Sequence, residues 1–237
     1  MNSPNVAVVF AGPNALDQAD IRLAVLRIPE VTQKLRDAQT IVEKFSSSGA
    51  DLRAFLISED REFNANPRLR SLVCAIVQIG LFERWSKFQP KPNYLIGHSN
   101  LDSALQFAAG RKGLEDIIRD SAFMNRKPLG QFMAQSISTP ILGGVELVEY
   151  EISIFSDGTQ KYITIRSHEM DALRLFSYMA DQLPIDQIVN VGPGCPLFSN
   201  YNKILTEKKI LIVDSIYVDP MLEWFWKSIK PVDTISQ

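Results

Sequence analysis

Cysteine and histidine are scarce in this chain, which has two of each among its 237 residues. Cys74 lies inside an apolar helical pattern, and Cys195 follows a Gly-Pro-Gly turn. These positions give neither a disulfide framework nor the spacing of metal ligands. The pattern favours a protein of a reducing compartment, and we expect no bound metal.

An excess of charge of one sign is also lacking. The 25 Lys and Arg residues nearly balance the 27 Asp and Glu residues, and the basic residues are scattered along the chain. No apolar run approaches the about 20 residues of a membrane span, and the first residues, MNSPNVAVVFAG, show no basic segment before their short apolar run. We therefore expect a cytoplasmic protein that binds neither nucleic acid nor membranes.

The chain has the composition of an ordinary globular protein, with 46% apolar and 22% charged residues. A chain of this length builds one main core, so we expect a single α/β domain over residues 1–237. Short apolar strands are predicted at 5–10, 94–96, 188–191 and 210–214. Helices are predicted at 17–27, 30–45, from 67 onward, at 101–108, 113–124, 168–182 and 197–207, and from 220 onward. This alternation is typical of a parallel sheet covered by helices.

The stretch between the predicted helices at 113–124 and 168–182 is strand-like. Runs rich in β-branched and aromatic residues at 145–155 and 162–166 flank the turn Ser156-Asp157-Gly158, which predicts a β-hairpin. Pro128, Pro140 and Gly143 interrupt the residues before it. We expect the interval 125–166 to hold at most this hairpin and its connecting segments.

The segment Gly97-His98-Ser99-Asn100 joins a predicted strand to a predicted helix. In a nucleophile elbow, the serine stands at the apex of such a turn, so its Oγ projects from the sheet and the next backbone N–H points toward a forming oxyanion. The helix N-terminus adds a dipole that favours negative charge. The sequence therefore predicts an elbow with Ser99 as the candidate nucleophile and Asn100 as a candidate oxyanion donor.

Four segments resemble the malonyl-CoA:acyl-carrier-protein transacylases and the related acyltransferase domains of polyketide synthases. Gly97 to Gly110, GHSNLDSALQFAAG, is similar to the family's GHSLGE segment and its Ala-Ala-Gly end. Val8 to Gly12 is similar to the family's first strand and the start of its Gly-Gln-Gly loop, which implies Gly12 beside the oxyanion. Asn66-Pro67 stands where the family has Gln-Pro, and Ile188 to Leu197, IVNVGPGCPL, is similar to its late strand and Gly-Pro-Gly turn.

The chain departs from this family at three places that matter for chemistry. Pro13, which has no N–H, replaces a Gln whose backbone N–H helps to form the oxyanion hole. Met124 replaces an Arg that grips the malonyl carboxylate, with Arg126 nearby. The interval 125–166 is too short for the ferredoxin-like subdomain that brings the family's catalytic His. The resemblance thus implies that this subdomain is missing or reduced to a hairpin, and that the general base was lost with it.

A replacement base has few candidates, because only His98 and His168 exist in the chain. His98 is adjacent to Ser99, and its family counterpart is a neighbour rather than the base, so packing at the turn is its ordinary role. His168 begins a predicted helix after a strand-like run, at the sheet edge where we expect Ser99. It is a candidate base, with an exposed helix-start residue as the alternative.

The turn Gly192-Pro193-Gly194 offers a candidate site for a phosphate of coenzyme A or phosphopantetheine, although such turns also occur for structural reasons. The thioester of either group would be a substrate, and we expect no bound cofactor.

Three functions remain open on these grounds. The primary hypothesis is a catalytically degenerate, acyltransferase-like protein that binds an acyl carrier protein or a synthase component in fatty-acid or polyketide biosynthesis. The alternative is a Ser99-dependent acyltransferase or acyl-thioester hydrolase, with His168 or another chain supplying the base. The third is a structural subunit of a homo- or hetero-oligomer, such as a dimer with an active paralogue.

Overall fold

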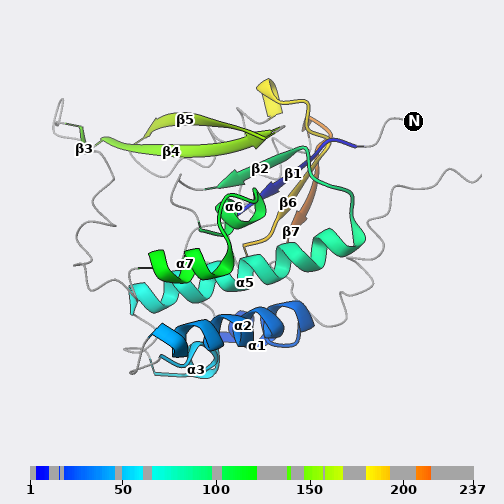
Figure 1. Ribbon diagram of the computed structural model, residues 1–237. Helices are drawn as coiled ribbons and strands as arrows, with labels where there is room; N and C mark the ends of the chain where they lie inside the picture. The colour runs from blue at the N-terminus through cyan, green and yellow to red at the C-terminus, as the bar shows by residue number, and fades with distance from the viewer. Residues whose placement is uncertain are drawn as a thin grey trace, which may run out of the picture.

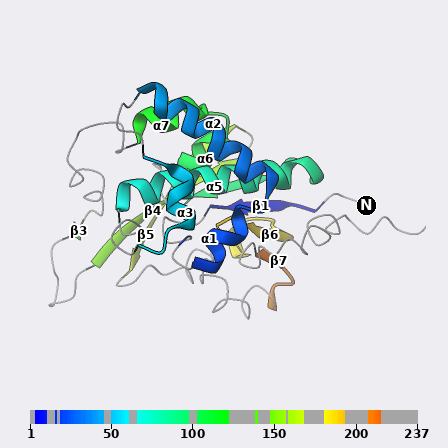
Figure 2. The same ribbon diagram turned by 90° about the horizontal axis from the view of Figure 1, so that it is seen from below.

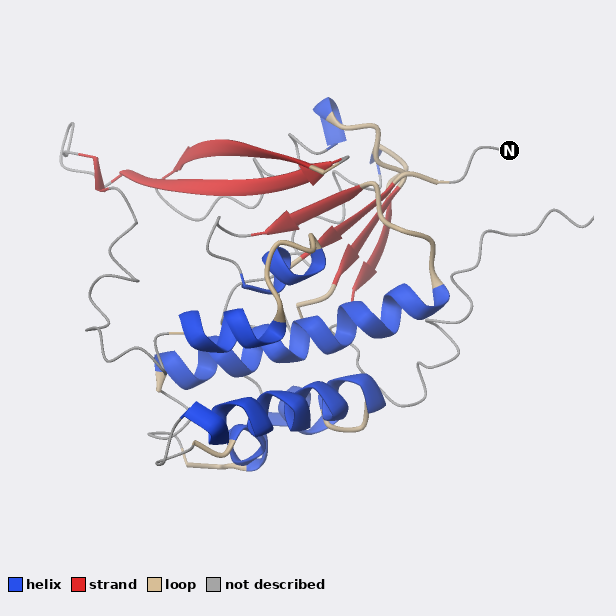
Figure 3. Ribbon diagram, viewed as in Figure 1, coloured by secondary structure: helices blue, strands red, loops and turns tan. Residues whose placement is uncertain are grey.

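The computed structural model describes residues 4–10, 16, 19–45, 50–60, 66–97, 103–121, 138–139, 147–156, 158–167, 180–192 and 207–214 (Figure 1). Within these ranges, the chain forms a seven-stranded sheet with a layer of helices along one side of it (Figure 3). The α/β class predicted from the alternation of strands and helices is confirmed at this level.

Four strands of the sheet run parallel and lie in the order β2-β1-β6-β7. They are β2 (Tyr94–Gly97), β1 (Val6–Val9), β6 (Gln187–Asn190) and β7 (Leu211–Asp214). Val9 is level with Ile96 on one side and with Asn190 on the other, and Asn190 is level with Asp214. The carboxyl ends of the four strands therefore meet at one edge of the sheet.

The rest of the sheet is antiparallel, so the sheet is mixed rather than parallel throughout. Strand β4 (Leu147–Ser156) pairs antiparallel with β2, with β5 (Thr159–Ser167) and with the short β3 (Ser138–Thr139). Strands β4 and β5 form the predicted hairpin, in which Ser156 pairs with Thr159. Gly158 has a φ of +75°, a conformation that glycine adopts without a steric cost.

Two long helices dominate the helical layer. Helix α5 (Pro67–Phe88) begins as predicted, with the Asn66 side chain accepting hydrogen bonds from the N–H groups of Arg68 and Leu69. Helix α2 (Pro29–Phe45) crosses α5 (Figure 2). No helix in the described part of the chain is long and apolar enough to cross a membrane.

Four shorter helices complete the described layer: α1 (Ala19–Val25), α3 (Leu52–Ile57), α6 (Ser103–Ala108) and α7 (Leu114–Asp120). Helix α3 was not predicted from the apolar pattern. Its start nevertheless has a sequence signal, since the Asp51 carboxylate accepts from the N–H groups of Arg53 and Ala54 at 2.9 Å.

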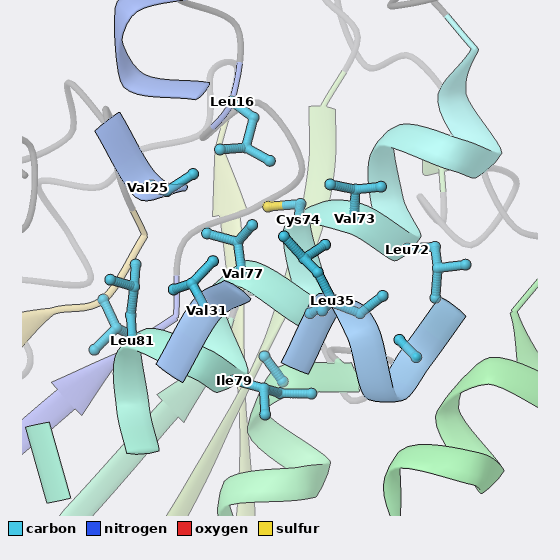
Figure 4. Packing of buried hydrophobic residues seen from close by; sticks show 14 of the residues in the cluster. Leu16, Val25, Val31, Leu35, Leu72, Val73, Cys74, Val77, Ile79 and Leu81 are labelled. Atoms are coloured by element: carbon cyan, nitrogen blue, oxygen red, sulfur yellow. The ribbon is translucent and has the colours of Figure 1, made fainter. Parts of the chain in front are cut away.

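Both faces of the central strands are buried. Val6, Val8 and Phe10 belong to the cluster that the helices form with one face of the sheet. Figure 4 shows part of this cluster, where side chains of α5 pack against Val31 and Leu35 of α2. On the opposite face, Ala7 and Ile96 are also fully buried. Burial on both faces explains why these strands are apolar runs without alternation.

Candidate functional site

The carboxyl edge of the parallel strands is the part of the fold that bears on function. The ladder continues one residue past the strands, because the Phe10 N–H donates to the Ile96 carbonyl at 2.8 Å and the Val191 N–H donates to the Val9 carbonyl at 3.0 Å. The carboxyl ends of β1, β2 and β6 are therefore neighbours at this edge. Ligands of open α/β sheets bind at this kind of edge.

Most of the candidate residues lie outside the described residues. They are Gly12, His98, Ser99, Asn100, Arg126, His168 and Gly194. Their mutual geometry therefore remains a prediction. Gly192 is the one candidate that the structure describes, and it is buried just past the end of β6.

The flanks of the predicted elbow are described even though its apex is not. Strand β2 ends at Gly97, which is buried, and α6 begins at Ser103. Helix α6 buries Ala104 and Leu105 and contacts both β2 and α5. The strand and the helix on either side of Ser99 are thus present, whereas the predicted elbow turn falls on residues outside the described part of the chain.

Asn190 shapes the turn after β6 and was not singled out by sequence reasoning. It is fully buried, and its side-chain oxygen accepts a hydrogen bond from the Gly192 N–H at 3.0 Å. This local bond is an Asx turn, which bends the chain away from the strand direction. The available signal was an Asn two residues before the Gly-Pro-Gly sequence.

The β4–β5 hairpin projects past the carboxyl edge. Strand β2 pairs with β4 at Ser153, Ile154 and Phe155, and Gly97 is opposite Ser153. Because the two strands are antiparallel, residues 147–152 continue beyond the end of β2, by about 20 Å at about 3.4 Å per residue. Figure 1 shows this overhang beside β2. The hairpin is therefore an arm that flanks the carboxyl edge of the parallel strands.

The end of the arm gives the position of Ser167, the residue before His168. Ser167, the last residue of β5, pairs with Val148 near the far end of the overhang. Tyr162 pairs with Ser153, the partner of Gly97, so Ser167 lies five residues, or about 17 Å, past the level of Gly97. The described part of β5 therefore ends well beyond the end of β2, and His168 comes next in the sequence.

The perturbed acid and base groups of the described chain lie at the other end of the sheet. Burial raises the pKa of Glu30, but hydrogen bonds from Lys87 and Arg84 outweigh it, so the pKa is lowered overall. Lys87 and Arg84 belong to the last turns of α5, which leads into the amino end of β2. The pKa of Lys208 is raised by its hydrogen bond to Asp181. Lys208 precedes the amino end of β7, and Asp181 precedes the amino end of β6.

The described residues contain no group of three or more His, Cys, Asp and Glu side chains that could hold a metal ion. Comparison of the chain with models of known protein families and with curated protein sequences gave no match.

Proposed function

We propose that this protein is a shortened relative of the malonyl-CoA:acyl-carrier-protein transacylases that has lost ordinary malonyl transfer. It binds an acyl carrier protein, or a component of a fatty-acid or polyketide synthase, at the carboxyl edge of its sheet. Ser99, Asn100 and Gly12 line that edge in this proposal, and any acyl group arrives as a thioester of coenzyme A or phosphopantetheine.

The observation that carries the proposal is the adjacency of β1, β2 and β6. Val8 to Gly12, Gly97 to Gly110 and Ile188 to Leu197 are far apart in the sequence, and each resembles a different segment of the transacylase family. Each match starts inside one of these strands and runs past its carboxyl end, and the three strands are parallel neighbours with level ends. Convergence at one edge is what a common thioester-binding site requires, and it supports the resemblance.

The loss of transfer follows from the chemistry of the replaced residues. Pro13 offers no N–H to a tetrahedral intermediate, and the loss of one oxyanion donor alone lowers turnover by about 100- to 1,000-fold. Met124 cannot form the charge-assisted hydrogen bonds with which an Arg holds a carboxylate. The described residues of the interval 125–166 belong to β3, β4 and β5, which extend the main sheet. This placement agrees with an interval that carries no separate subdomain with a catalytic His.

A second candidate function keeps Ser99 as a nucleophile, in an acyltransferase or an acyl-thioester hydrolase. The observation in its favour is that β5, which His168 follows in the sequence, ends toward the same edge of the sheet as β2, which Ser99 follows. The overhang of the arm argues against it, because Ser167 already lies about 17 Å past the level of Gly97, whereas a base must come within about 3 Å of Oγ.

Intact-protein mass spectrometry after incubation with malonyl-CoA or acetyl-CoA separates the two functions. The proposal predicts an unchanged mass for the wild-type chain, and malonyl transfer to a carrier protein far below the about 10 per second of a median enzyme. An acyl adduct on the wild-type chain that Ser99→Ala removes would establish the second function instead. An adduct that survives Ser99→Ala would place the chemistry elsewhere and contradict both.

A further inference from the structure

Strand β5 ends the sheet on the side of the hairpin. Its nine residues pair along their whole length with β4, and among the described strands β4 is its sole partner. The other edge of β5 therefore faces no described strand. A long strand edge of this kind is a template for pairing with another chain.

The tight turn of the hairpin determines which backbone groups β5 directs outward. Ser156 and Thr159 flank the two-residue turn and pair with each other. In such a hairpin this closing pair exchanges both hydrogen bonds, and bonded and non-bonded pairs alternate beyond it. The residues of β5 whose N–H and C=O groups lie on its outer edge are then Gln160, Tyr162, Thr164 and Arg166.

We propose that β5 pairs antiparallel with β5 of a second copy of this chain, across a two-fold axis at Thr164. Thr164 then faces Thr164 of the second copy, in a pair that exchanges two hydrogen bonds. Ile163 faces Ile165 on one face of the joined sheet, and Tyr162 faces Arg166 on the other, each twice by symmetry. Pairs of β-branched residues, Thr–Thr pairs and a cation beside an aromatic ring all stabilise neighbouring strands.

The charges of β5 agree with this register. Lys161 faces Ser167 of the second copy, and Arg166 faces Tyr162, so no two cations meet. An axis at Ile163, the middle residue of β5, would instead place Lys161 opposite Ile165 and forgo the Tyr162–Arg166 pair. Of these two registers, the one about Thr164 is the more complementary, and this self-complementarity favours a second copy as the occupant.

The test is the oligomeric state of the full chain, measured by sedimentation equilibrium, with three variants. Thr164→Pro removes both central hydrogen bonds, each worth up to about tenfold in affinity, and leaves the bonds to β4 untouched because that N–H points outward. Thr164→Glu and Thr164→Lys each place two like charges opposite each other across the two-fold axis, which weakens the dimer by up to about fivefold. Thr159→Glu is the matched control, because its partner in this register lies beyond the end of β5.

The proposal predicts a wild-type dimer, dissociation by Thr164→Pro and weaker pairing in either charged variant. It also predicts that an equimolar mixture of Thr164→Glu and Thr164→Lys chains forms a heterodimer at least as strong as the wild-type dimer, since residue 164 faces itself only about this axis. Circular dichroism shows whether each variant is folded. A monomeric wild type, a dimer that the Thr164 variants leave unchanged, or charged variants that fail to pair when mixed would overturn the proposal.

Discussion

The close approach of the α2 backbone to Gly80 of α5 predicts that Gly80→Ala destabilises the fold. Gly80 lies in α5 where α2 crosses it, and a Cβ added at this position would stand 2.6 Å from the Val31 Cα and 2.9 Å from the Val31 N. Ordinary van der Waals contact begins at about 3.4 Å, so α2 must shift by nearly 1 Å. The obstacle is backbone, which cannot rotate aside as a side chain can.

Two opposing effects set the magnitude. Forcing a methyl group into a packed interior costs about 1–3 kcal/mol, and a backbone obstacle puts this case at the upper end. Replacing glycine by alanine inside a helix returns about 1 kcal/mol. We expect the free energy of unfolding to fall by about 2 kcal/mol, which lowers the melting temperature by about 4–8 °C in a chain of this size.

Urea denaturation followed by circular dichroism measures this change, with two accompanying variants. Ser71→Ala, at an exposed position of the same helix, isolates the propensity effect and should stabilise slightly. The double variant Gly80→Ala with Val31→Ala should remain destabilised, because removing the Val31 Cγ2, also 2.9 Å away, leaves both backbone atoms in place. A neutral or stabilising Gly80→Ala, or its rescue by Val31→Ala, would refute this account of the helix crossing.

Three further predictions concern single side chains. Glu30 has a folded pKa below its ordinary value of 4.5, so its contribution to stability is present above that pH and is lost as the pH falls through the folded pKa. Glu30→Gln should therefore cost about 1–2 kcal/mol at pH 7 and flatten the acid limb of a stability–pH profile, whereas an unchanged profile would contradict the pairing with Arg84. Asn190→Ala leaves the Gly192 N–H without its acceptor and should cost about 1–3 kcal/mol in urea denaturation; no loss would mean that the turn does not depend on this bond. His168→Ala should leave the melting temperature and any residual activity nearly unchanged, and an activity lost in both His168→Ala and Ser99→Ala with the fold intact would revive the second candidate function.

The sequence predicted most elements whose pattern is local and strong. Helix α5 was predicted because Pro67 and a long apolar period define it, and β1 and β6 because uninterrupted apolar runs suit strands buried on both faces. The antiparallel attachment of β4 to β2 was not predicted, since strand partners are chosen by packing across the whole domain. Asn190 was overlooked because a single buried amide has no periodic signature. The elbow apex and His168 stay predictions, as they lie outside the described residues.

The measurement that tests the central claim most directly is a calorimetric titration of the chain with an acyl carrier protein that bears its phosphopantetheine. The account predicts saturable binding that Ser99→Ala leaves unchanged, because binding does not use the hydroxyl as a nucleophile. It also predicts that Ser99→Arg weakens binding at least tenfold, by filling the carboxyl edge with a large charged side chain, while circular dichroism shows an intact fold. Absence of binding by the wild-type chain, or binding that Ser99→Arg leaves unaffected, would contradict the claim.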